Sequence, residues 1–229
     1  MKSLWQTAFV LHRRAYRETS YLVDFFTRDA GIVTAVAKGV KNSKSDRKSL
    51  LQPFARINVQ LAGRSELKNL AQVESSAAML FLQGKNLFCA LYVNELLSRV
   101  LPKGLACEEL FDHYQTTLHA LAGDAPPDVA LRDFEFALLE EMGQLPDLLN
   151  DAATGEPVTK EHWYQFVQEL GIVRASKPGQ SRSVPGTALL SMHHRDWDSP
   201  ARQAAKLIAR QALLPLLGDK PLKSRELFR

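Results

Sequence analysis

Cysteines, export signals and long apolar runs are scarce or absent in this sequence. Its 229 residues include only 2 cysteines, Cys89 and Cys107, which are too few for a four-thiolate zinc site. No apolar run reaches the roughly 18 residues that a membrane-spanning helix needs, so we expect no membrane partner. Nothing at the N-terminus resembles an export signal. We therefore expect the chain to work in a reducing cytoplasm.

Signatures of catalysis are missing as well. The sequence has no Walker loop, dinucleotide fingerprint, G-x-S-x-G elbow or H-E-x-x-H motif. His193 and His194 lie beside Asp196, but adjacent histidines point in different directions and no second ligand cluster accompanies them. Both cysteines are more simply explained as buried structural residues. We predict neither an enzyme nor a cofactor, and no metal.

What the sequence does contain is a globular composition with unevenly divided charge. Hydrophobic residues make up 45% and charged residues 24%, and the length favours two domains. Residues 1–80 hold 13 basic and 6 acidic side chains, residues 81–198 hold 9 and 17, and residues 199–229 hold 7 and 2. Basic segments that bracket an acidic body suggest a polyanionic partner, most often nucleic acid.

The first 75 residues alternate with the period of two that is typical of β-strands. A turn at Arg28–Gly31 joins two of these runs into a hairpin. Five short strands suit a small closed barrel of the oligonucleotide-binding (OB) type. The predicted strands cover residues 5–12, 21–26, 32–38, 56–61 and 67–73.

From residue 84 the apolar period changes to 3.6, so we predict a helical domain over 81–229. Helices are expected over 87–101, 110–122, 127–142 and, with Ser199 as N-cap, 199–217. Residues 144–197 are rich in proline and glycine and are predicted as a loop-rich insertion with one short helix near 161–170 and a small hairpin. The fold class is thus α+β multidomain, with an OB barrel before an α-helical domain.

Basic residues recur in several predicted loops of the barrel. The segment Lys38–Lys48 is expected to be a loop between the third and fourth strands that presents cations to phosphates. Tyr16, Tyr21 and Phe54 are candidates for base stacking, although aromatic residues of strands are more often core. A solvated basic surface is the alternative. The predicted DNA-binding residues are Arg13, Arg14 and Arg17 in the first connection, Lys38, Lys41, Lys44, Arg47 and Lys48, Arg64 and Lys68 beside the last hairpin, and Arg202, Lys206, Arg210, Lys223 and Arg225 near the C-terminus.

Several stretches resemble the bacterial RecO family of DNA repair proteins. They are W-Q-x-A-F-V-L-H (5–12), R-x-x-x-E-T-S (14–20), A-K-G (37–39), L-Q-P-F (51–54), L-Y-V-N-E-L-L-S-R-V-L (91–101), L-R-D-F-E-F-A-L-L (131–139) and P-L-K-S-R-E-L-F (221–228). The resemblance keeps its order along most of the chain and is weak only between residues 144 and 197.

The resemblance implies a recombination mediator of the RecF pathway without catalytic turnover. Such proteins bind single- and double-stranded DNA, anneal complementary strands, contact the acidic C-terminal tail of single-stranded DNA-binding protein (SSB) and, together with RecR, help to load RecA. They work on the nucleoid when bound to DNA. Many relatives carry a four-cysteine zinc site, which this sequence lacks, so we predict no zinc.

An SSB tail needs an apolar pocket and a basic residue for its terminal carboxylate. Arg132 is the only basic residue between Lys103 and Lys160, and it either anchors such a tail or forms a local salt bridge with Asp128 or Glu135. The predicted pocket consists of Phe111, Tyr114, Leu118, Leu131, Arg132 and Phe134.

Two other classes of function stay open. An OB-fold adaptor that binds RNA or has a structural role would share the basic loops but would lack annealing activity. A nuclease would need clustered carboxylates for Mg²⁺, whereas the acidic residues of 1–80 are scattered.

Overall fold

The computed structural model describes residues 4–41, 47–176 and 182–228, which form two compact units. The first unit comprises residues 1–124 and 222–229, and the second comprises residues 125–221. The sequence predicts a domain boundary at residue 80, where strands are followed by helices. In the structure, the two helices that follow residue 80 pack within the first unit. The boundary at residue 80 therefore stays a prediction.

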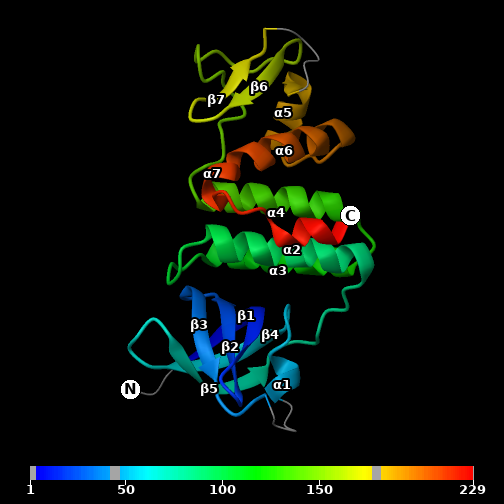
Figure 1. The fold of residues 1–229 in the computed structure, drawn as a ribbon. Coiled ribbons are helices and arrows are strands. Elements are labelled where there is room, and N and C mark those ends of the chain that lie inside the picture. The colour runs from blue at the N-terminus through cyan, green and yellow to red at the C-terminus, as the bar shows by residue number, and fades with distance from the viewer. Residues whose placement is uncertain (1–3, 42–46, 177–181, 229) are drawn as a thin grey trace. The chain divides into compact units, whose positions relative to one another are not determined.

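The N-terminal strands form a closed five-stranded barrel, as predicted (Figure 1). Its strands are paired in the order β1-β2-β3-β5-β4, with β4 antiparallel to β1 and β3 parallel to β5. The short helix α1 (Arg47–Leu50) precedes β4. The strand bounds are Trp5–Tyr16 for β1, Ser20–Thr27 for β2, Gly31–Ala37 for β3, Arg56–Ala62 for β4 and Lys68–Ser75 for β5.

The alternation in the sequence separates the inside of the barrel from its outside. Every second residue of β2 and β3 faces inward, where small and β-branched side chains fill a narrow interior. The inward-facing set includes Val23, Phe25, Ala35, Ala37, Ile57 and Val59, all completely buried. The neighbouring residues Leu22, Asp24, Thr34 and Val36 therefore face outward.

A bulge in β1 between Val10 and His12 interrupts this alternation. Beyond it, Arg13 lies opposite the inward-facing Val23, and Arg14 lies opposite the outward-facing Leu22. Directly opposed residues in an antiparallel pair share a face. The bulge thus determines which of the two adjacent arginines lies on the outer surface.

Two long helices and the C-terminal segment complete the first unit. Helix α2 spans Gly84–Val100, and α3 spans Glu108–Ala122. The 3₁₀ helix η1 (Lys223–Phe228) returns to α2, where the Glu95 carboxylate accepts hydrogen bonds from the backbone N–H groups of Lys223 (2.9 Å) and Ser224 (2.8 Å). Although burial alone would raise the pKa of Glu95, its hydrogen bonds with Ser224 and Lys223 and the nearby Arg99 lower it.

An aromatic cluster joins the helices to the outer face of the barrel. The rings of Phe9 and Phe26 lie 5.0–5.8 Å from those of Phe111 and Tyr114. Asn94 donates to the carbonyl of Leu11 (2.8 Å) and accepts from the Tyr114 hydroxyl (2.6 Å). The carbonyl at the bulge is satisfied in this way by a helix side chain.

Gly31 allows a close approach in the same region. It has a φ of +61°, and a Cβ atom there would lie 1.8 Å from the carbonyl oxygen of Leu105. Only glycine fits both conditions. The predicted turn at Arg28–Gly31 is thereby confirmed.

The second unit contains α4 (Pro127–Glu141), α5 (Gly186–His193), α6 (Ser199–Ala212) and α7 (Leu214–Leu217). Helix α6 lies between α4 and α5 (Figure 1). Asp198, rather than the predicted Ser199, caps α6, because its side chain accepts from the N–H of Ala201. Arg195 holds the chain before α6 against α4 through ion pairs with Asp133 (3.1 Å) and Glu140 (2.9 Å).

The predicted helix near residues 161–170 is wrong. The region holds strands β6 (Trp163–Val167), β7 (Gly171–Arg174) and β8 (Ser183–Pro185) in the order β7-β6-β8, so the expected hairpin is present. Aromatic and β-branched residues favour a strand here, and Glu169 and Gly171 adopt positive φ values at the turn. The buried Asp151 tethers the preceding loop to β7 by accepting from the N–H groups of Ala153 and Arg174.

Candidate nucleic-acid interface

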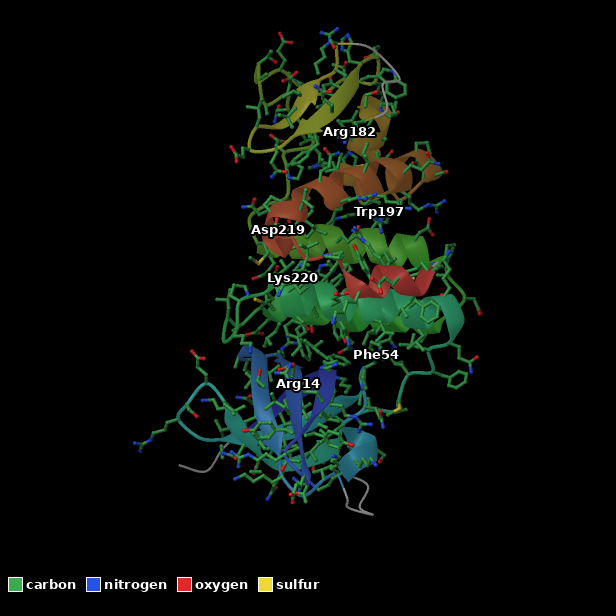
Figure 2. The ribbon with its side chains drawn as sticks, in the orientation of Figure 1. Arg14, Phe54, Arg182, Trp197, Asp219 and Lys220 are labelled. Atoms are coloured by element: carbon green, nitrogen blue, oxygen red, sulfur yellow. The ribbon has the colours of Figure 1, made fainter. Side chains whose placement is uncertain are left out.

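The barrel has an open end, which we define as the β1–β2 turn with the adjoining ends of β1, β2 and β3. Arg13 and Arg14 lie within β1, not in the connection that was predicted, and only Arg17 is in the turn. Arg14 is exposed on the outer face (Figure 2). Arg13 points inward and donates to the carbonyl of Lys48 at 2.9 Å. Of the two arginines in β1, Arg14 is therefore the one available to a ligand on the outer face.

A cleft of about 620 Å³ lies at this open end. We call it the Tyr16–Lys38 cleft. By the strand register, Ser20 and Val36 belong to the outer face. The lining residues are Tyr16, Arg17, Glu18, Thr19, Ser20, Val36 and Lys38.

Two arginine–tyrosine stacks flank the open end, one on each face of the sheet. The guanidinium carbon of Arg17 lies 5.2 Å from the centre of the Tyr16 ring, and that of Arg13 lies 5.0 Å from the Tyr21 ring. Arg17 has a φ of +53°, an unusual conformation for a non-glycine residue, which positions it at the tip of the turn. Tyr16 and Tyr21 are both half-buried, and Tyr21 packs against the barrel core.

The segment Lys38–Lys48 is not wholly a loop. Arg47 and Lys48 begin helix α1, and Lys44 lies outside the described residues. Lys38 and Lys48 are exposed, whereas Lys41 and Arg47 are half-buried. Arg47 donates weakly to the carbonyl of Ala71 on β5, at 3.4 Å.

The remaining predicted residues of the barrel, Arg64, Lys68 and Phe54, differ in their exposure and contacts. Arg64 is exposed in the β4–β5 turn, while the Lys68 ammonium donates to the Gly63 carbonyl at 3.1 Å. Phe54, labelled in Figure 2, is only 7% exposed and its backbone N–H donates to Val10. Phe54 is therefore part of the core and unsuited to base stacking.

The basic residues predicted near the C-terminus are divided between the two units. On α6, Lys206 and Arg210 are exposed, and Arg202 pairs with Asp128 at 3.0 Å. Lys223 and Arg225 are exposed on η1, which belongs to the first unit. Within the described part of the chain, Lys206 and Arg210 form no ion pair, so only these two residues of the predicted cationic stripe on α6 lack a local carboxylate partner.

The six residues predicted to bind an SSB tail are also divided between the units. Phe111, Tyr114 and Leu118 belong to the first unit and are completely buried, the first two against the barrel. Leu131, Arg132 and Phe134 belong to the second unit, where Leu131 is half-buried and Phe134 is completely buried. Arg132 is only 7% exposed and pairs with Glu135 at 2.8 Å. Arg132 therefore forms the local salt bridge with Glu135 that the sequence offered as the alternative to a tail anchor.

Comparisons with known proteins identify the family of this chain. The family models described as the N-terminal and C-terminal regions of recombination protein O match residues 1–79 and 82–226. The chain belongs to the RecO family. It is 50% identical to the DNA repair protein RecO of Alteromonas mediterranea over 229 residues, covering 100% of this chain and 98% of that protein. Identity to RecO of Haemophilus influenzae (strain PittGG) is 45% (100% and 97% covered), and to RecO of Yersinia pestis (strain Pestoides F) 44% (98% and 94%).

Membership of the RecO family places this chain in DNA repair and recombination. The described residues include no group of three or more His, Cys, Asp or Glu side chains that could hold a metal ion. Within the same described ranges, none of the helices is long and apolar enough to cross a membrane.

Sequence reasoning missed several residues that shape the open end of this RecO barrel. Glu18, Thr19, Ser20 and Val36 line the cleft. The first three end the R-x-x-x-E-T-S stretch quoted for the family resemblance, but they were not predicted as binding residues. The period-two alternation places Val36 outward, and this was the one available signal for it. The bulge, which moves Tyr16 to the outer face, has no local signature in the sequence.

Proposed function

We propose that this chain binds single- and double-stranded DNA through phosphate contacts at the open end of the barrel. The observation that carries the proposal is the gathering of the exposed cations Arg14, Arg17 and Lys38 there. The exposed Lys48 lies on the neighbouring helix α1, where its carbonyl accepts from Arg13. Among the residues that the structure describes, no carboxylate forms an ion pair with Arg14, Arg17 or Lys38. Cations without acidic partners are available to neutralise phosphates and release their counterions.

Phosphate contacts explain why both forms of DNA are proposed as ligands. A phosphate chain is common to single strands and duplexes, and contacts to it position a protein without reading sequence. We further propose that the chain anneals complementary strands, since cations that bind two strands at once lower their mutual repulsion. Assembly with RecR, help in loading RecA and the absence of catalytic turnover are proposed on the resemblance to the family.

The test is an annealing assay with labelled complementary strands, run beside a binding titration on each strand and on the duplex. We expect annealing above the spontaneous rate, together with binding to all three DNAs that weakens as salt is raised. Binding without faster annealing would favour the alternative of an RNA-binding or structural adaptor. Strand cleavage in the presence of Mg²⁺ would contradict the absence of turnover.

We also propose that Arg132 receives the terminal carboxylate of an SSB tail. Support comes from its isolation as a cation within an acidic region and from the fork geometry of a guanidinium, which binds a carboxylate while keeping a second partner. Leu131 is half-buried beside it. A tail bound there would share Arg132 with Glu135.

A pair of variants tests this tail site. Arg132→Ala is expected to weaken binding of a tail peptide by about 1.5–3 kcal/mol, the scale of a hydrogen bond to a charged group. Because this change alone leaves Glu135 buried without its cation, the double variant Arg132→Ala/Glu135→Gln serves as the control for folding. Both should bind naked DNA normally. Equal losses for peptide and DNA, or unchanged peptide binding by the folded double variant, would contradict the assignment.

A further inference from the structure

The Tyr16–Lys38 cleft combines features that a phosphate site alone does not need. Its lining residues include one tyrosine, one valine, two residues with aliphatic hydroxyls, two cations and one carboxylate. Its volume of about 620 Å³ lies within the range of roughly 300–1,000 Å³ that is usual for small-ligand pockets. We propose that this cleft binds one unpaired nucleobase together with its neighbouring phosphate, an inference that rests on the proposed DNA binding.

The Arg17–Tyr16 stack supplies the surface for the base. With its guanidinium carbon 5.2 Å from the centre of the Tyr16 ring, Arg17 adds a second planar group to the aromatic one. Bases stack on both aromatic rings and guanidinium planes. Val36 of the adjoining strand β3 lines the cleft but is only 7% exposed, so it adds little surface. The stack of Arg17 and Tyr16 therefore provides most of the flat surface for a base.

The polar groups of the cleft match the phosphate and the edge of the base. A guanidinium that stacks by its face still donates hydrogen bonds from its edge, so Arg17 can meet a phosphate without leaving Tyr16. Lys38 provides a second cation at the end of β3. Glu18 is the acidic lining residue and, with the exposed Thr19, offers groups for the polar edge of a base.

This arrangement selects single strands over duplexes. In a duplex the base is stacked and paired, and moving it out costs a few kcal/mol. A single strand presents its bases at little cost. The cleft therefore adds affinity for single strands to the phosphate contacts that serve both forms.

The experiment compares an oligothymidylate with an abasic oligonucleotide of the same length and charge. Unaltered protein is expected to bind both, and the oligothymidylate about 5- to 20-fold more tightly, the lower part of the range for one stacked base. Tyr16→Ala should abolish this preference and leave abasic binding unchanged. Tyr16→Phe, which retains the ring, should keep it.

Arg64→Gln is the matched control, because Arg64 is an exposed cation of the same barrel outside the cleft. It should weaken both oligonucleotides by the same factor. Equal affinities of unaltered protein for the two oligonucleotides would overturn the inference and leave phosphate binding intact. Binding of neither would overturn the proposed function as well.

Photocrosslinking of the unaltered protein gives a readout that does not depend on any variant folding. An oligonucleotide that carries a photoreactive uracil should crosslink to the peptide that contains Tyr16. Crosslinks confined to other peptides would place the base elsewhere and overturn the inference.

Discussion

The outer face of the barrel is built from the same strands at both ends, but it packs against helices at one end and is exposed at the other. At the end covered by helices α2 and α3, the outward side chains Phe9 and Phe26 are fully buried against Phe111 and Tyr114. At the open end, the same strands present Tyr16 and Arg14 to solvent or to the cleft. One strand thus changes from a packing surface to a candidate binding surface within a few residues.

The arginines of the two ends show what the difference means electrostatically. Arg28, at the covered end, pairs with Asp112 and Glu108 of α3, and its hydrogen bond to Asp112 raises its pKa. Arg17 at the open end stacks on a ring, with no carboxylate paired to it among the described residues. The carboxylates of Asp112 and Glu108 hold Arg28 in structural ion pairs, whereas Arg17 is available to bind a ligand. Charge counts alone do not distinguish these two roles.

Removing an aromatic ring at the covered end is the strongest test of the difference between the two ends. Phe111→Ala should lower the free energy of unfolding by about 3–5 kcal/mol, because it leaves a cavity among four packed rings. Urea denaturation measures the loss. Tyr16→Ala at the open end is the control and should cost less than about 1 kcal/mol, since its ring is only half-buried. Equal losses would mean that the ends do not differ in this way.

Neutralising cations at the open end should affect DNA and not stability. Replacing Lys38, Lys41 and Lys48 together with glutamine should reduce the salt slope of single-strand binding by roughly 0.7 per lost contact. At 0.1 M salt this corresponds to about 100-fold in affinity for three contacts. Anisotropy titrations over a range of salt concentrations measure the slope. An unchanged slope would show that the phosphates bind elsewhere.

The hydrogen bonds of Asn94 allow a finer test of the covered end. Asn94→Ala leaves the Leu11 carbonyl and the Tyr114 hydroxyl without their buried partner, so we expect a loss of about 2–3 kcal/mol in unfolding free energy. Calorimetric unfolding measures it. Asn86→Ala, on the half-buried first turn of the same helix, should change stability much less. Similar losses in both variants would point to helix propensity instead of the buried hydrogen bonds.

The smallest expected effect concerns the docking of η1 on Glu95. Because its folded-state pKa is lowered, the charged form stabilises the docked segment above the ordinary value near 4.5, and this contribution is lost as the pH falls through the folded pKa. Glu95→Gln should cost about 1–2 kcal/mol at neutral pH and remove the acid dependence. Hydrogen exchange of the Lys223 and Ser224 amides reports the docking. Protection that persists in acid would contradict this account.

Local patterns in the sequence predicted the barrel and the four long helices α2, α3, α4 and α6. Alternation placed Val23 and Phe25 on one face of their strand, which the structure shows to be the inner face, and Gly31 marked its turn. Strand period and positive φ are properties of a few neighbouring residues. The same reasoning failed near residue 165. There, an aromatic, β-branched run of strand type was interpreted as a helix, and its pairing with β7 and β8 decides the outcome.

For this member of the RecO family, the sequence by itself determined the family, the five barrel strands, the four long helices and the uneven division of charge. Only the tertiary structure decided which charged and aromatic side chains are available to a ligand. The bulge in β1 directs Arg14 outward and Arg13 inward, Glu135 pairs with Arg132, and the barrel buries Phe111 and Tyr114. The physical reason is that exposure and ion pairing depend on residues distant in the chain, whereas strand and helix periods depend on near neighbours.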